Sequence, residues 1–234
     1  MKKFALGDCH GNFKALKQCL ERSNFNYSED KLIVLGDVCD GFPYVKECFE
    51  ELLKIKNLVY ILANHDAWCL EYYDKGVVDY NGLPKEVWTS QGGYNTLNSY
   101  GEKMIETHLN LLKNAPLYHL EDDCLFVHGG IDPHQPDIDK QDPQVLLWDR
   151  DLLWYAKTKN SSKSWYKYGG YNKIFIGHTT TQQYNSFKPI KWCNVVAIDT
   201  GAGWSGKLTI MNIKTEEYWQ SDLAKKLYPD IEGR

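Results

Sequence analysis

Residues 3–11 read Lys-Phe-Ala-Leu-Gly-Asp-Cys-His-Gly, a short apolar run that ends in a glycine, a carboxylate and an imidazole. The same design recurs at residues 32–37, Leu-Ile-Val-Leu-Gly-Asp, and at residues 58–66, Leu-Val-Tyr-Ile-Leu-Ala-Asn-His-Asp. Short apolar runs of this kind are typical of buried strands in a parallel sheet. Because ligand sites in open α/β sheets lie beyond the carboxyl ends of the strands, the three polar clusters are expected to meet there.

The segments between these runs have helical periodicity. Apolar residues of 13–22 and 44–55 recur at the three- and four-residue spacing of a helix face. Alternating strands and helices predict an α/β fold, and 234 residues fit a single domain, residues 1–234. The further elements expected are a helical insertion around 80–114 (with helices at 87–91, 94–100 and 103–114), a hairpin of 117–120 and 124–127, a helix over 143–156, and strands at 173–176, 195–198, 208–213 and 216–219.

The composition is that of an ordinary globular protein, with 43% hydrophobic and 25% charged residues and a net charge of −4. A mildly acidic chain has no overall field that attracts nucleic acid or anionic membranes, so neither is expected as a general partner. Seven cysteines at scattered positions indicate reduced thiols and a cytoplasmic location. No segment is apolar enough for a signal peptide or a membrane span, and a monomer is expected.

Two later apolar runs also end in glycine-flanked histidines, in the motifs 128–130 (HGG) and 177–179 (GHT). With the first three clusters they supply carboxylate, imidazole and amide side chains, which suit divalent cations with more than four coordination positions. Two such cations need an anionic ligand between them, and Asp37 is the expected bridge. Asp8 and His10 are expected to complete one metal site, and Asn64, His128 and His178 the other.

Two cations held in this way suit phosphoryl transfer, because they lower the pKa of a water between them and clamp the phosphoryl oxygens for in-line attack. The leaving alkoxide still needs a proton, and His65, next to Asn64, is the expected general acid. Asp40, three residues after Asp37, is expected to hold the imidazole in the productive tautomer. Any one of these histidines could be an ordinary half-buried residue, but their shared position at strand ends favours the metal interpretation.

Five motifs follow one another in the order 7–11 (GDCHG), 36–41 (GDVCDG), 64–66 (NHD), 128–130 (HGG) and 177–179 (GHT). This series resembles the signature of the calcineurin-like metallophosphoesterases, over about residues 4–203. Its order and compact length resemble the bacterial and phage Ser/Thr protein phosphatases of the lambda-phosphatase type. The resemblance implies a central β-sandwich of two mixed sheets flanked by helices, and a dinuclear site for which Mn²⁺ is expected, with Fe, Zn, Ni or Co as alternatives.

The function that the resemblance implies is metal-dependent hydrolysis of phosphomonoesters in a phosphorylated protein or a small phosphate ester, most directly by a Ser/Thr protein phosphatase. The alternative is an enzyme of the same chemistry that acts on nucleotides, such as a diadenosine tetraphosphatase, an RNA-end phosphatase or a phosphodiesterase. A binding module without activity would have lost a ligand or the acid, and all six ligands and His65 are present.

The sequence departs from the family pattern in its second motif, where Gly41 stands in place of an arginine that contacts phosphate. The loss of that guanidinium removes a bidentate clamp. Arg150 resembles the family's other phosphate-contacting arginine and is expected to carry this role, with Asn64 as a second phosphate contact. The third motif of the family usually reads GNHE, and residues 63–66 read Ala-Asn-His-Asp here.

Three other segments receive simpler interpretations. Residues 201–206 (GAGWSG) match the GxGxxG pattern, but a strand is expected to follow them, so they predict a hairpin and not a dinucleotide site. Lysines alternate with aromatic residues over 155–173, which would suit a nucleotide, although an exposed loop is the simpler interpretation. Residues 231–234 (IEGR) match a protease recognition sequence used in protein engineering, and no role is assigned to them.

Overall fold

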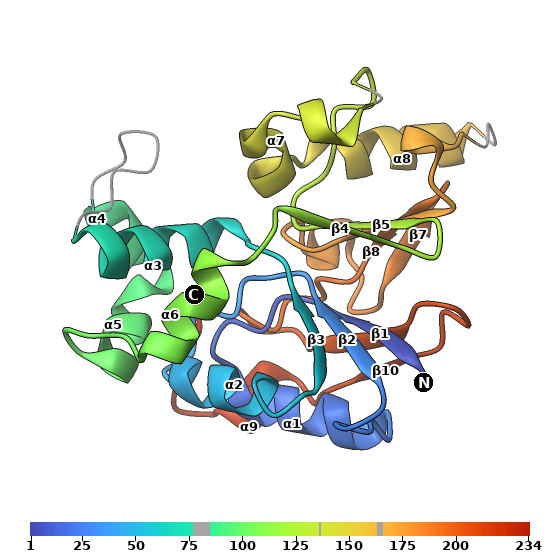
Figure 1. The fold of residues 1–234 in the computed structure, drawn as a ribbon. Coiled ribbons are helices and arrows are strands. Elements are labelled where there is room, and N and C mark those ends of the chain that lie inside the picture. Colours follow the sequence, from blue (N-terminus) through green and yellow to red (C-terminus); the bar gives the residue numbers. More distant parts are fainter. Residues whose placement is uncertain (77–84, 136, 163–165) are drawn as a thin grey trace.

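The computed structural model describes residues 1–76, 85–135, 137–162 and 166–234. Two five-stranded mixed sheets lie face to face at its centre, and helices cover their outer faces (Figure 1). This confirms the predicted α/β fold with a central β-sandwich flanked by helices. Residues 80–84 of the predicted helical insertion, and Lys163 and Trp165 of the segment 155–173, lie outside the described residues.

The first sheet has the strand order β10-β9-β1-β2-β3. The strands of the three repeated motifs, β1, β2 and β3, are parallel neighbours, as the sequence predicts. Two antiparallel strands extend it on the β1 side. Helices α1, α2 and α9 cover its outer face (Figure 1). The elements are β1 (Lys3–Leu6), α1 (Phe13–Arg22), β2 (Lys31–Val34), α2 (Val45–Leu52), β3 (Asn57–Tyr60), β9 (Thr209–Asn212), β10 (Tyr218–Gln220) and α9 (Ala224–Leu227).

The second sheet has the strand order β4-β5-β6-β8-β7. Its three central strands are parallel, and the predicted hairpin forms one antiparallel edge. The edge strand β7, which the sequence analysis did not predict, closes the other side. The elements are β4 (Tyr118–Glu121), β5 (Cys124–Val127), β6 (Lys173–Ile176), β7 (Ile190–Trp192) and β8 (Val195–Ala197), with α7 (Pro143–Trp148) and α8 (Asp151–Ser161) over the outer face.

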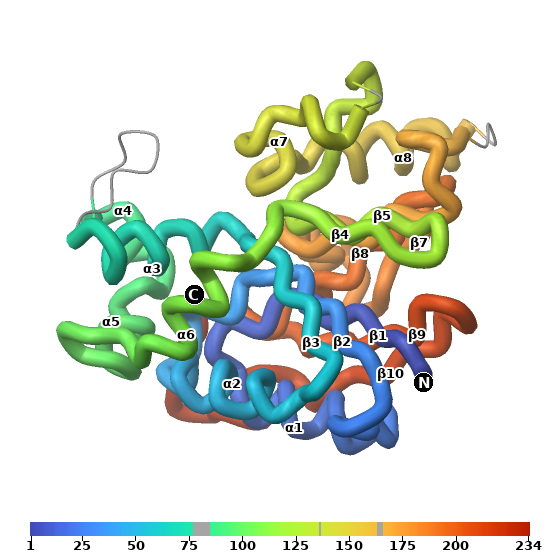
Figure 2. Tube along the Cα trace, viewed as in Figure 1, coloured from blue at the N-terminus to red at the C-terminus, as the bar shows by residue number. Residues whose placement is uncertain are grey.

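A group of helices stands at the end of the first sheet toward which β1, β2 and β3 run, while the N-terminal residue lies at the opposite end (Figures 1 and 2). The first of these helices begins directly at Asn64, and the sequence analysis did not predict it. The group consists of α3 (Asn64–Lys75), α4 (Lys85–Trp88), the π-helical turn η2 (Thr89–Gly93), α5 (Tyr94–Tyr100) and α6 (Glu106–Lys113). Its position beside the strand ends allows it to contribute to a site there.

The predicted single helix over 143–156 is wrong, because the chain breaks between α7 and α8. Asp149 has an extended ψ of 138°, and its carboxylate accepts a hydrogen bond of 2.9 Å from the backbone N–H of Leu152. An aspartate that caps the following turn in this way competes with continued helix. Arg150 therefore lies in the break between two helices and not on a helix face.

Alternating side chains of the strands separate the core into layers. In β1, Phe4 and Leu6 pack toward the helices, while Ala5 faces the second sheet. The layer between the sheets contains buried residues of both, among them Phe126 and Phe175, whose rings are stacked at 4.9 Å. This layer fixes the distance between the sheets, and with it the positions of the loops that follow β2, β5 and β6.

We expect Phe175→Ala to lower the free energy of unfolding by about 3–5 kcal/mol, because it leaves a cavity between the two sheets. The exposed Phe187 offers a matched control, and Phe187→Ala should change stability by less than about 0.5 kcal/mol. Urea denaturation followed by circular dichroism measures both. Equal effects of the two substitutions would contradict the assignment of Phe175 to the inter-sheet core.

Candidate active site

The six predicted metal ligands follow strands of both sheets and converge on one carboxylate. Asp37, directly beyond β2, is almost fully buried. Its Oδ2 atom lies 3.5 Å from Nε2 of His10 and 3.4 Å from Nε2 of His128. Its Oδ1 accepts a 3.0 Å hydrogen bond from the backbone N–H of His65, at the start of α3. The carboxylate is therefore oriented from one side and faces imidazoles on the other.

The side chains form two groups that share this carboxylate. Ligand atoms of Asp8, His10 and Asp37 lie within 4.8 Å of one another, and so do those of Asp37, His128 and His178. Asn64 belongs beside the second group, since its Oδ1 lies 2.8 Å from Nε2 of His128. The structure thus brings together all six residues, although they are separated by up to 170 positions along the chain.

Backbone carbonyls orient two of the imidazoles. Nδ1 of His10 lies 2.9 Å from the carbonyl oxygen of Cys39, and Nδ1 of His128 lies 2.8 Å from that of Leu35. A carbonyl oxygen can only accept, so both Nδ1 atoms carry hydrogen and both Nε2 atoms face the site. This is the usual arrangement of histidines that present Nε2 to a cation.

Two atoms of the cluster have no hydrogen-bond partner among the described residues: Oδ1 of Asp8 and Nε2 of His178, both buried. An unsatisfied buried polar atom costs about 1–3 kcal/mol. The other oxygen of Asp8 accepts from the backbone N–H of His178 at 2.9 Å, so the free oxygen is held in a fixed direction. Oxygen and imidazole donors in this arrangement fit two divalent cations.

The pKa values of Asp37 and His178 in the cluster also favour the binding of cations. Burial opposes ionisation of Asp37, but the surrounding imidazoles hold its pKa well below its usual range. Burial lowers the pKa of His128, but the carboxylates of Asp37 and Asp8 outweigh this effect and raise it to about 9. Burial and the charge of His128 keep the pKa of His178 well below its usual range, so its nitrogen lone pair is available.

Behind the cluster, His65 and Asp40 form the predicted pair. Nδ1 of His65 lies 2.5 Å from Oδ2 of Asp40. Burial raises the pKa of the Asp40 carboxyl, and hydrogen bonds from Thr96 and Trp88 oppose this rise by stabilising the carboxylate. The Thr96 hydroxyl donates at 2.7 Å and the Trp88 indole at 2.9 Å. Trp88 and Thr96 carry no sequence motif, so only the structure identifies them as the residues that hold Asp40.

The sequence profile described as "calcineurin-like phosphoesterase" matches residues 1–190. The chain belongs to this family. It is a phosphoesterase, and the family uses a dinuclear metal centre. The proteins of Bacillus cereus (strain Q1) and Bacillus thuringiensis (strain Al Hakam) named bis(5′-nucleosyl)-tetraphosphatase PrpE [asymmetrical] are each 28% identical to it. The alignments cover 89% of both chains for the first and 90% of both for the second.

Solved structures of phosphatases share the fold. A candidate diadenosine tetraphosphatase superposes with a TM-score of 0.68 at 15% identity, over 94% of this chain and 92% of that one. A cold-active protein tyrosine phosphatase superposes with a TM-score of 0.61 at 16% identity, over 94% and 78%. At these identities the similarity establishes the fold alone. In the part of the chain that the structure describes, no helix is long and apolar enough to cross a membrane.

A residue for which the sequence analysis gave no role, Asp66, fixes the loop of this phosphoesterase that carries Asp37. Its Oδ2 accepts from the backbone N–H of Asp37 at 2.8 Å and from the Tyr60 hydroxyl at 2.9 Å. Its Oδ1 accepts from the backbone N–H groups of Val38 and Cys39 at 3.2 and 3.1 Å. One buried carboxylate thereby satisfies three consecutive backbone donors of the loop.

Two arginines reach the cluster from different directions. Arg150, exposed at the break between α7 and α8, donates through Nη1 to the carbonyl oxygen of His178 at 2.9 Å and approaches the Thr179 hydroxyl at 3.5 Å. Arg234, to which the sequence analysis assigned no role, lies with Nη1 3.0 Å from Nε2 of His10. Gly41, where the family pattern has an arginine, has no side chain that could reach the cluster.

We expect Asp66→Asn to lower the free energy of unfolding by about 1–3 kcal/mol, because an amide nitrogen would face backbone N–H donors that need an acceptor. Bound metal per chain, measured by mass spectrometry, should fall as well, since the loop orients Asp37. The exposed Asp230 provides a control, and Asp230→Asn should change neither quantity. Unchanged stability in Asp66→Asn would show that the loop holds itself without this carboxylate.

Proposed function

We propose that this phosphoesterase hydrolyses dinucleoside polyphosphates, cleaving a phosphoanhydride bond of a bis(5′-nucleosyl) tetraphosphate. The observation that carries the proposal is the similarity to the PrpE tetraphosphatases, which extends over 89% of both chains and is not limited to the metal motifs. This is the nucleotide-directed alternative considered from the sequence. The departure from the protein-phosphatase pattern at Gly41 agrees with a different substrate class.

In this proposal, Asp8, His10 and Asp37 hold one divalent cation, and Asp37, Asn64, His128 and His178 hold the other. Mn²⁺ is the expected metal, as the resemblance to the family implies, and carboxylate and amide oxygens suit it. When bound, the pair activates the attacking water and neutralises charge on the phosphoryl oxygens. The unpartnered Oδ1 of Asp8 and Nε2 of His178 support these assignments.

The remaining side chains position the substrate and handle the leaving group. The guanidinium of Arg150 lies beside His178 and binds a phosphoryl oxygen, and the Asn64 amide is the second phosphate contact. His65 faces the site with its Nδ1 tied to Asp40, so its Nε2 handles the proton of the leaving group. Cleavage of a phosphoanhydride bond releases the phosphate group of a nucleotide as the leaving group. This group is stable without the proton, whereas a leaving alkoxide must be protonated.

The second candidate is a Ser/Thr protein phosphatase. The observation that favours it is the buried His65–Asp40 pair, since a serine or threonine alkoxide must be protonated as it leaves. For both candidate functions we also propose that the protein is cytoplasmic and monomeric. The two functions differ in leaving group and in the presence of a nucleoside, so substrates separate them directly.

We expect the Mn²⁺-loaded protein to convert diadenosine tetraphosphate to ATP and AMP, with a kcat/KM at least about tenfold above that for a phosphoserine peptide, a margin of about 1.4 kcal/mol. Chromatography of the nucleotides and release of inorganic phosphate measure the two reactions, and a sample with chelated metal is the blank. Turnover of the phosphopeptide alone would overturn the nucleotide proposal in favour of the protein phosphatase. Turnover of a 2′,3′-cyclic nucleotide alone would indicate a phosphodiesterase.

We expect His65→Asn to keep its metal but to lose turnover according to the leaving group. On a phosphoserine peptide the loss should be about 10²- to 10⁴-fold, the usual contribution of a general acid. On diadenosine tetraphosphate it should be smaller, because the leaving phosphate is stable without that proton. The exposed His134 offers a control, and His134→Asn should change neither rate. Loss of metal from His65→Asn would contradict the role of His65 as a proton donor.

A further inference from the structure

The last residues of the sequence form an ordered wall of the active site. Tyr228, just after α9, stacks on Phe42 with ring centroids 5.0 Å apart, and Ile231 packs against the same small cluster. The backbone N–H of Arg234 then donates to the carbonyl oxygen of Gly203 at 2.8 Å. The segment 228–234 is therefore fixed at several points before its final side chain enters the site.

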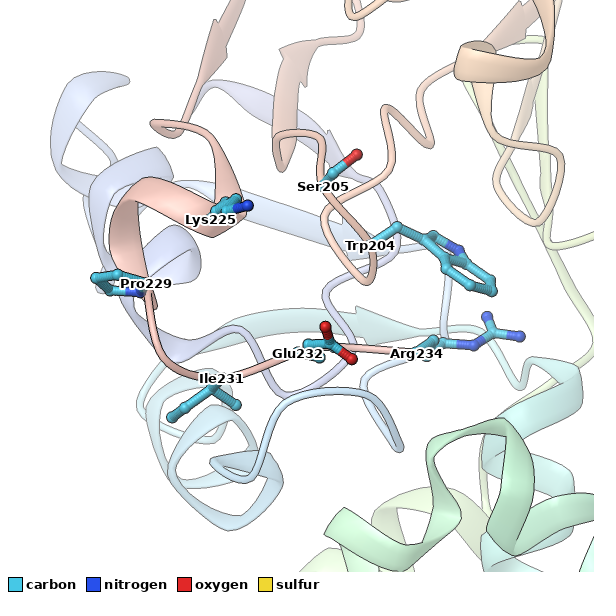
Figure 3. A pocket seen from close by; sticks show the side chains of 8 residues that line it. Trp204, Ser205, Lys225, Pro229, Ile231, Glu232 and Arg234 are labelled. Carbon is cyan, nitrogen blue, oxygen red and sulfur yellow. The ribbon is translucent and has the colours of Figure 1, made fainter.

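The Arg234 side chain extends beside Trp204. Figure 3 shows the two side chains pointing in the same direction, away from Lys225 and Pro229. The guanidinium carbon lies 5.1 Å from the Trp204 ring centroid, within the range of a cation–π interaction. Nη1 lies 3.0 Å from Nε2 of His10, a nitrogen that faces the candidate metal centre. Stacking and the backbone hydrogen bond thus aim a positive charge at the cluster.

Two glycines lie beside this side chain. A Cβ atom built on Gly92 would crowd Cγ of Arg234 at 3.1 Å, and one built on Gly41 would lie in ordinary contact with it at 3.5 Å. A Cβ on Gly41 would also come within 2.8 Å of Cβ of His10, so a larger residue there would displace the histidine. The family pattern places an arginine at position 41. In this chain Arg234, from the C-terminal segment, brings a guanidinium to the same region.

Among the described residues, the guanidinium has one acceptor, Nε2 of His10. The Nε atom of Arg234 is buried and has no hydrogen-bond partner in the described part of the chain. None of the carboxylates among the described residues forms an ion pair with the guanidinium, and Asp40 and Asp199 interact with its charge only at longer range. Arginine offers five N–H donors in a planar fork, and the geometry of that fork matches the oxygens of a phosphate.

We propose that Arg234 is a substrate-binding residue that donates to a phosphoryl oxygen next to His10. The proposal rests on the proposed function, because the substrate must carry a phosphate. His10 would hold a cation through Nε2, the nitrogen that Nη1 contacts here, and the cation and the guanidinium would then repel each other. An anionic phosphate between them relieves that repulsion and supplies further acceptors to the guanidinium.

The position of the guanidinium allows a ligand to reach it. A cleft of about 360 Å³ runs along the segment and is lined by Trp204, Lys225, Glu232 and Arg234, among others (Figure 3). Arg234 lies at one end of these side chains and is only partly buried, and its guanidinium points away from Lys225 toward the tip of Trp204 (Figure 3). Arg150 reaches the cluster from a different direction, the break between α7 and α8.

The test measures binding of inorganic phosphate to the Mn²⁺-loaded full chain by titration calorimetry, together with kcat and KM. We expect Arg234→Ala to weaken phosphate binding by roughly 10- to 100-fold, the loss expected for hydrogen bonds to a charged group. Arg234→Lys should recover part of the affinity, because lysine keeps the charge but not the fork. Lys225→Ala removes an exposed cation that lines the same cleft and should leave the affinity within about twofold.

Several outcomes would overturn the proposal. Unchanged phosphate affinity in a folded, metal-loaded Arg234→Ala protein would exclude the contact. Tighter phosphate binding or faster turnover in this variant would show that the guanidinium blocks the site. Loss of bound metal in both Arg234 variants would show that it organises the ligands. Because phosphate binding requires no turnover, failure of the wild-type protein on dinucleoside polyphosphates would leave this test intact.

Discussion

The buried carboxylate of Asp37 is the constraint around which the site is built. A carboxylate in a protein interior is stable only when positive charge and hydrogen-bond donors surround it. Here the imidazoles of His10 and His128 approach one oxygen, and the backbone N–H of His65 donates to the other. His128, whose pKa is raised to about 9, brings positive charge to this point, and a pair of divalent cations would supply more.

The two sheets make this convergence possible. Asp37 follows a strand of the first sheet, while His128 and His178 follow strands of the second. Their approach depends on the apolar layer that holds the sheets face to face, including the stacked Phe126 and Phe175. The hydrolytic site is therefore a product of the inter-sheet packing, and a change in that packing moves ligands relative to one another.

Segments outside the sandwich also shape the site. Trp88 and Thr96, from the helical group beside the strand ends, hold the Asp40 carboxylate that orients His65. The segment 228–234 brings the guanidinium of Arg234 next to His10. The sandwich carries the strand ends on which the cluster is built, and in the proposed function these additions lie next to the phosphate and its leaving group.

The sequence by itself determined the three parallel strands of the first sheet, the hairpin and the six residues that meet at the strand ends. Each of these could be predicted from a local sequence pattern, because apolar runs and the glycines next to them are recognisable in the sequence alone. The two-sheet arrangement came from the resemblance of the ordered motifs to a family, since periodicity alone indicated only parallel strands. The break at Asp149 was missed because a side-chain cap overrode the helical pattern. The contacts of Trp88, Thr96 and Arg234 with the site were decided only by the tertiary structure. They join residues 48, 56 and 224 positions apart through one or two hydrogen bonds each, and no local pattern encodes such a contact.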